Sequence, residues 1–154
     1  MPGTKKKAIS VASRKDKGRR LQKDLARRIS DLLGLPWGKD ELIAPRPMGQ
    51  GGPDIVLKGE AFERFPWCFE CKWQEIWSVP DWVRQVLATL QKEREEGRDF
   101  QAWALVMRRS RKGPRSQRLS DLVVMDIDTF FALFKELHRF YRTHEQWVKD
   151  KDTC

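Results

Sequence analysis

The chain has 154 residues and a formal net charge of +9, with 40% hydrophobic and 34% charged residues. This length suits one domain with a hydrophobic core. No apolar stretch approaches the roughly 20 residues that span a bilayer, and no apolar segment follows the basic N-terminus. We therefore expect a soluble, cytoplasmic protein that has no membrane partner.

Most of the excess positive charge lies in the first fifth of the chain. Residues 1–34 contain eleven Lys and Arg against three Asp. Residues 1–15 lack apolar periodicity, which predicts a flexible basic arm. From Gly18 onward apolar residues recur at helical spacing until Gly34, which indicates a helix with a basic outer face.

The middle of the chain predicts three strands and a helix. Residues 42–46 and a run that begins at Asp54 are short apolar segments, separated by a Gly-rich loop. Residues 66–73 are rich in aromatic side chains and predict a central strand. Helical periodicity then returns from Trp82 to Leu90.

Two further strand-length runs, 102–107 and 122–125, flank a basic loop, and Asp128 is a candidate cap for a last helix through Phe140. The order α-β-β-β-α-β-β-α predicts an α/β protein with a central mixed five-stranded sheet flanked by helices. We expect one domain over residues 16–145, followed by a C-terminal tail, 146–154.

Three charged side chains stand out between Gly51 and Glu75. Asp54 follows a Gly-Gly-Pro turn, and Glu70 and Lys72 lie inside the aromatic run. Alternation along a strand places Glu70 and Lys72 on one face, and hairpin pairing with the preceding strand would bring Asp54 beside Glu70. Charged groups are costly in an apolar strand unless they have a partner or a task.

This pattern predicts a metal site that hydrolyses phosphodiesters. Asp54 and Glu70 would bind Mg²⁺, for which Mn²⁺ could substitute, and the backbone carbonyl of Cys71 would add a third ligand. Lys72 would position the attacking water, while the metal stabilises the charge that develops on phosphorus. The sequence leaves one structural alternative open, an edge strand with a solvated Glu-Lys face.

The segments GPDIV and FECKWQ resemble the two motif halves of the PD-(D/E)XK nuclease superfamily, through Pro53-Asp54 and Glu70-Cys71-Lys72. The order of elements is similar to that of archaeal-type Holliday-junction resolvases and their phage-encoded relatives. The resemblance implies a restriction-endonuclease-like domain and a metal-dependent DNA endonuclease. It also implies a homodimer that makes paired symmetric incisions in four-way junctions, in a bacterial, archaeal or phage-infected cell.

The resemblance makes three glutamines candidate site residues. Related resolvases carry a glutamate in the first helix, four residues after a Lys-Gly pair, where this chain has Gln22. An amide can bind a metal-held water but is a weaker ligand than a carboxylate, so the number of metals stays open. Gln85 matches a glutamine that many nucleases of the superfamily place on the helix after Glu-x-Lys. Gln50 stands in the loop where resolvases often present a serine, and is a candidate contact to phosphate.

The two basic clusters predict a nucleic-acid partner, because such segments attract a phosphate backbone irrespective of its sequence. A solvated, solubilising surface is the alternative explanation of the charge. The residues that we expect to contact DNA are Lys17, Arg19, Arg20, Lys23, Arg27, Gln50, Arg108, Arg109, Arg111 and Lys112.

Two other functions remain open at this point. The same chemistry would serve a nuclease that acts on other branched, nicked or single-stranded DNA in phage replication or repair. A non-catalytic module that only binds DNA would also use the basic segments, but would have little need for Asp54, Glu70 and Lys72 together.

Overall fold

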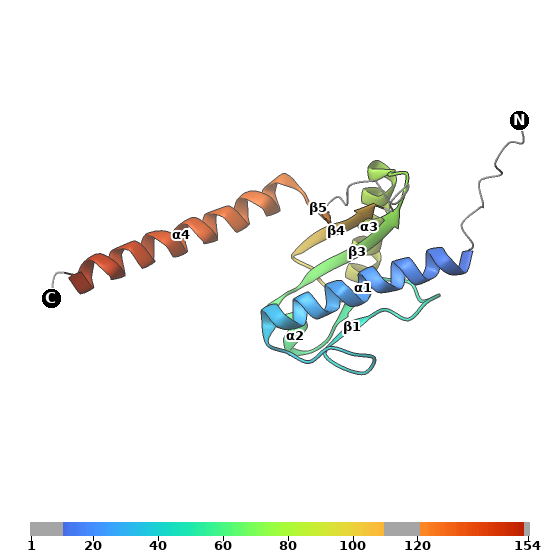
Figure 1. Cartoon of the computed structure of the whole chain (residues 1–154), viewed down its shortest axis with the longest axis horizontal. Helices are drawn as coiled ribbons and strands as arrows, with labels where there is room; N and C mark the ends of the chain where they lie inside the picture. Colours follow the sequence, from blue (N-terminus) through green and yellow to red (C-terminus); the bar gives the residue numbers. More distant parts are fainter. Residues whose placement is uncertain (1–10, 110–120, 153–154) are drawn as a thin grey trace, which may run out of the picture. The chain divides into compact units, whose positions relative to one another are not determined.

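The computed structural model describes residues 11–109 and 121–152, and the side chains of 15–109 and 121–141 (Figure 1). The chain divides into two compact units, Met1–Val124 and Met125–Cys154. The first unit holds every described strand, and the second holds a single described helix. We expected one domain through residue 145, whereas the division falls directly after the last strand.

The first helix, α1, spans Val11–Leu33, so residues 11–15 are helical rather than part of an arm. It ends where we predicted. Gly34 takes the left-handed conformation, with φ of 67°, and its N–H donates to the Ser30 carbonyl at 2.8 Å. Leu21, Ala26 and Ile29 on one face of α1 are buried in the main hydrophobic cluster. Burial of this stripe anchors the helix to the strands.

Two short strands follow, β1 (Ile43–Pro45) and β2 (Ile55–Leu57), and they pair antiparallel. A five-residue helix, α2 (Glu60–Arg64), then leads toward the next strand. The predicted order of elements has no helix at this place. A single helical turn with one buried residue, Ala61, is too short to give an apolar period.

The second sheet contains β3 (Trp67–Gln74), β4 (Ala102–Arg109) and β5 (Leu122–Val124) in that order. The strands β3 and β4 are parallel, and β5 is antiparallel to β4. Parallel neighbours need a crossover connection, which is supplied by helix α3 (Val79–Glu95). The α/β class and the mixed pairing agree with the sequence.

The predicted five-stranded sheet is wrong, because the five strands form separate sheets of two and three strands. Strand β2 has only three residues and pairs with β1 alone. One backbone hydrogen bond connects the hairpin to β3 where a ladder was expected, from the Asp54 N–H to the Phe69 carbonyl at 2.8 Å. The hairpin therefore meets β3 at Asp54 without extending the sheet.

The second unit contains α4, which spans Ile127–Asp152 and so continues into the predicted tail. Its cap is Asp126 rather than Asp128. The Thr129 N–H and hydroxyl donate to the two Asp126 carboxylate oxygens at 2.7 and 2.8 Å. Within the described part of the chain, we find no helix with both the length and the apolar character needed to cross a membrane.

Candidate functional site

Strand β3 separates two environments by simple alternation of its side chains. Phe69 and Cys71 are buried in the cluster that includes the apolar face of α1, whereas Cys68 packs with Val86 of α3 and Phe100. Glu70 shares the Cys68 face and is only 5% exposed. The central strand therefore directs a buried carboxylate toward α3.

Glu70, Lys72 and Gln85 form a closed set of polar contacts. The Lys72 ammonium lies 2.7 Å from Glu70 Oε1 and donates to Gln85 Oε1 at 2.8 Å. Gln85 Nε2 in turn donates to Glu70 Oε1 at 2.9 Å. Each member of the set contacts the other two, so α3 fixes the lysine and the glutamate that β3 supplies.

Asp54 is held by one contact from β3 and one from α1. Its Oδ2 accepts the Cys71 backbone N–H at 2.7 Å, and its Oδ1 accepts the Gln22 side-chain amide at 2.7 Å. The first contact places Asp54 next to the residue that follows Glu70, although no β2–β3 ladder exists among the described strands. The second contact brings in α1 across 32 positions of the sequence.

The two carboxyl groups affect each other electrostatically. Burial raises the pKa of Asp54 above its usual value, against the lowering effect of the Cys71 N–H and the Lys72 charge. Burial also raises the pKa of Glu70, and the neighbouring Asp54 charge raises it further. Two acids that resist ionising together are the kind of pair that a divalent cation stabilises.

The donor set fits a hard cation that keeps several waters. Among the side chains that the structure describes, no group of three or more His, Cys, Asp or Glu residues gathers as a metal cage. Asp54 and Glu70 alone match Mg²⁺, which commonly binds proteins through one or two carboxylates. The Cys71 N–H serves Asp54, and the predicted role of the Cys71 carbonyl stays a prediction.

A pocket of about 420 Å³ opens beside Asp54. Its lining includes Gln22 and Gln50, which we had singled out, together with Lys15 and Arg46, which we had not. The pocket therefore joins Asp54 and Gln22 to two basic side chains. Its polar members come from α1 and from the loop between β1 and β2.

Arg46 is held firmly at this pocket. Its Nε donates to the Pro53 carbonyl at 2.5 Å, and its own carbonyl accepts Arg19 Nη1 at 2.7 Å. Gly52 has φ of 112°, and a Cβ there would lie 2.8 Å from Arg46 Cζ. The Gly-Gly-Pro turn thus leaves room for the guanidinium. An arginine between two prolines just before this turn is the signal that sequence reasoning missed.

Comparison with known proteins adds no assignment, because no family model, no curated protein and no solved structure matches this chain. The geometry of the site is therefore the basis for its interpretation.

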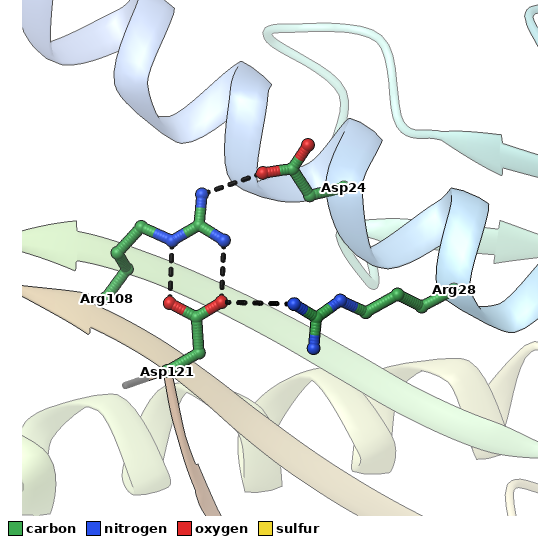
Figure 2. Close-up of polar contacts among 4 residues, drawn as sticks. All are labelled: Asp24, Arg28, Arg108 and Asp121. Carbon is green, nitrogen blue, oxygen red and sulfur yellow. Dashed lines mark hydrogen bonds and ion pairs between the residues drawn. The ribbon is translucent and has the colours of Figure 1, made fainter. Parts of the chain in front are cut away.

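Arg108, one of the predicted DNA contacts, is buried and paired with acids of this chain. Its side chain is buried, donating to both Asp121 oxygens at 2.7 and 2.6 Å and to Asp24 at 2.8 Å (Figure 2). It also lies over the ring of Trp73, with 4.8 Å from Cζ to the ring centroid. Arg28 lies 3.9 Å from the same Asp121 carboxylate. Arg108 therefore ties the end of β4 to α1.

The other predicted DNA contacts fall into three groups. Arg19 is partly buried against Arg46, and Lys17 is half-buried on the same helix. Arg111 and Lys112 lie outside the described residues. The exposed members of the set are Arg20, Lys23, Arg27, Gln50 and Arg109.

Proposed function

We propose that this chain is a metal-dependent endonuclease that hydrolyses phosphodiester bonds in DNA. The observation that carries the proposal is the contact between the Lys72 ammonium and Glu70 Oε1 at 2.7 Å, next to Asp54, which accepts the N–H of the intervening residue Cys71. Burial raises the pKa of both acids. An edge strand with a solvated Glu-Lys face would leave Glu70 exposed, whereas it is 5% exposed.

Asp54 and Glu70 are the residues that would hold Mg²⁺ or Mn²⁺. A divalent cation bound there would polarise the phosphodiester and lower the pKa of an attacking water. The neutral Gln22 side chain donates an amide N–H to Asp54 Oδ1, so it orients the carboxylate without adding negative charge. This favours a site built on two acids.

Lys72 is the residue that would contact the reacting groups. Its ammonium can donate to the attacking water or to a phosphate oxygen, while Glu70 and Gln85 hold two of its hydrogen-bonding directions. Gln85 is a positioning residue, because it acts on the reaction through Lys72 and Glu70. Such fixed donors lower a barrier since they do not reorganise during the reaction.

For the substrate we propose branched DNA, most specifically a four-way junction cut by a homodimer. The basic surface of α1 and the pocket beside Asp54 support a phosphate-rich partner. The choice of a junction follows the resemblance to resolvases.

The test is cleavage of a synthetic four-way junction, compared with duplex and single-stranded DNA of the same sequence, in Mg²⁺. We expect Asp54→Asn and Glu70→Gln each to slow junction cleavage by about 100-fold or more. The matched control is Asp40→Asn, an exposed acid in the loop before β1, which should cut like the wild type.

Binding of the same junction in Ca²⁺ separates chemistry from recognition. The two site variants should bind as tightly as the wild type. Junction binding without cleavage in either Mg²⁺ or Mn²⁺ would replace the proposal with a non-catalytic DNA-binding module. Faster cleavage of single-stranded or nicked DNA would keep the chemistry and change the substrate.

A further inference from the structure

Helix α4 carries a row of exposed large apolar side chains. Their exposures run from 41% for Phe130 to 65% for Ile127, and five of the eight are aromatic. The set, called the α4 stripe below, is Ile127, Phe130, Phe131, Leu133, Phe134, Leu137, Phe140 and Tyr141. Soluble surfaces rarely expose so many large apolar groups together, and such a patch marks an interaction site.

The stripe occupies one side of the helix. At 3.6 residues per turn its eight members fall within one half of the helix circumference, and Lys135, Glu136 and Arg139 lie on the other half. Arg139 and Glu136 pair with each other at 3.2 Å on that polar side. An amphipathic helix of this form needs a cover for its apolar half.

The unit that contains α4 cannot provide the cover itself. Its described residues form no other helix and no strand. Helices in proteins gain most of their stability from tertiary packing of an amphipathic face, and isolated helices are marginal in water. A 26-residue helix therefore depends on something outside its own unit.

We propose that the α4 stripe is covered by the α4 stripe of a second copy of this chain. Full burial of an aromatic side chain removes ~150–250 Å² of surface from water. The eight side chains of the α4 stripe are about half exposed, so together they offer on the order of 700 Å² per copy for burial. That is close to the ~800 Å² per partner of a standard specific interface. One helix can thus supply nearly a whole dimer interface.

A symmetric pair also satisfies the requirement that a two-fold interface be self-complementary. Apolar halves meet in the centre, and the Lys135, Glu136 and Arg139 side stays in water. The rest of the described chain offers no comparable surface. Its exposed large apolar residues are scattered over separate segments, at Leu32, Trp37, Met48, Ile76, Leu87, and Leu122 with Val123.

Pairing through α4 would join two nuclease units, which is what paired incision of a junction requires. This consequence rests on the proposed function, whereas the interface itself does not. A mass measurement tests the interface, and a cleavage assay of the site variants tests the proposed phosphodiester chemistry, so the two failures are distinguishable.

The first experiment measures the mass of the full chain by light scattering during size-exclusion chromatography, over a wide range of concentrations. One chain weighs 18.2 kDa, and we expect the wild type at twice that mass. The double variant Phe134→Glu/Leu137→Glu should have the mass of one chain. The matched control Lys135→Glu puts the same side chain on the polar side of α4 and should remain dimeric.

Several outcomes would overturn the proposal. They are a wild type with the mass of one chain at every concentration, larger assemblies of no fixed mass, and a dimer that survives the double variant. Tryptophan fluorescence during urea unfolding checks that the strand-bearing unit of each variant is folded.

A second experiment avoids destabilising substitutions. A photo-reactive benzoylphenylalanine replaces Phe134, and nitrogen-isotope-labelled and unlabelled chains are mixed before irradiation. We expect cross-linked peptides that contain α4 from one labelled and one unlabelled chain. Cross-links confined to single chains would show that α4 packs on its own copy, and would contradict the proposal. The same probe at Lys135 should give few mixed cross-links.

Discussion

At the scale of the residue, two glutamines organise the candidate site. Gln22 donates to Asp54 and Gln85 donates to Glu70, so each acid receives one amide from a different helix. Gln85 also accepts from Lys72, which makes it the only one of the two that contacts the lysine in the described structure. A neutral amide can orient a carboxylate without competing with it for a cation. We therefore expect Gln85 to have the stronger influence on the proposed catalysis.

We predict that Gln85→Leu slows junction cleavage by roughly 10- to 100-fold, because the Lys72 ammonium loses one of its two fixed partners. The effect should fall on kcat, with little change in DNA binding. Single-turnover cleavage in Mg²⁺ measures it. Gln91→Leu is the matched control, since Gln91 lies on the same helix and contacts only the exposed Glu95 in the described structure. Equal rates for the two variants would remove Gln85 from the site.

At the scale of the element, α1 serves three purposes with three of its sides. Its apolar side packs on the strands. One flank contributes Gln22 and Arg19 to the site, and the other contributes Asp24 and Arg28 to the Arg108 cluster (Figure 2). Its remaining side faces solvent. The Arg108 cluster joins α1 to the end of β4 through Arg108, and to Asp121, which directly precedes β5.

We predict that Arg108→Ala lowers the free energy of unfolding by about 2–4 kcal/mol, because the partly buried Asp121 carboxylate then lacks the two donors of the guanidinium. Urea denaturation followed by tryptophan fluorescence measures the loss. The matched control is Arg109→Ala at the neighbouring exposed position, which should change stability by less than about 0.5 kcal/mol. A similar small effect at both positions would mean that the cluster adds nothing to stability.

The cap of α4 gives a prediction that depends on pH. Hydrogen bonding from the Thr129 N–H lowers the pKa of Asp126 below its usual value of 3.8. The folded helix therefore prefers the charged cap, whose contribution is complete above pH 3.8 and is lost as the pH falls through the lowered value. Asp126→Ala should cost about 1 kcal/mol near neutral pH and almost nothing in strong acid.

Far-ultraviolet circular dichroism during thermal unfolding at several pH values measures this difference. Asp128→Ala is the control, because Asp128 follows the cap and its carboxylate makes no capping bond in the described structure. Equal effects of the two substitutions would restore Asp128 as the cap that the sequence suggested.

At the scale of the whole molecule, the distribution of positive charge makes the proposed DNA partner testable. The exposed Lys23 and Arg27 lie one turn apart on the solvent side of α1. Basic side chains that neutralise phosphates release counterions from DNA, so the affinity falls as salt rises. A net charge of +9 alone would predict only a general attraction.

We predict that Lys23→Gln/Arg27→Gln weakens junction binding and reduces the salt dependence of log affinity by up to about 1.8, or ~0.9 for each phosphate that is no longer neutralised. Fluorescence anisotropy at several salt concentrations measures the slope. The double variant Lys39→Gln/Lys58→Gln removes the same charge from exposed positions elsewhere and should keep the wild-type slope. Identical slopes in both variants would mean that only total charge matters.

The sequence by itself determined features with a short period or a local geometric requirement. Alternation along residues 67–74 placed Glu70 and Lys72 on one face, and Gly34 ended α1 because only a left-handed residue closes that turn easily. The same local reasoning failed at α2, where a single turn has no period. It also failed at the cap of α4, where Asp126 and Asp128 are equally suitable by residue type.

Only the tertiary structure decided which distant groups meet. Gln22 reaches Asp54 across 32 positions, and Arg108 reaches Asp24 across 84. The charge of Arg108 was visible in the sequence, whereas its burial was not, because the acids that neutralise it come from other elements. The contact of the β1–β2 hairpin with β3 at Asp54 likewise depends on long-range packing. Local periodicity fixes the direction of a side chain along its own element, and the packing of elements fixes what that side chain meets.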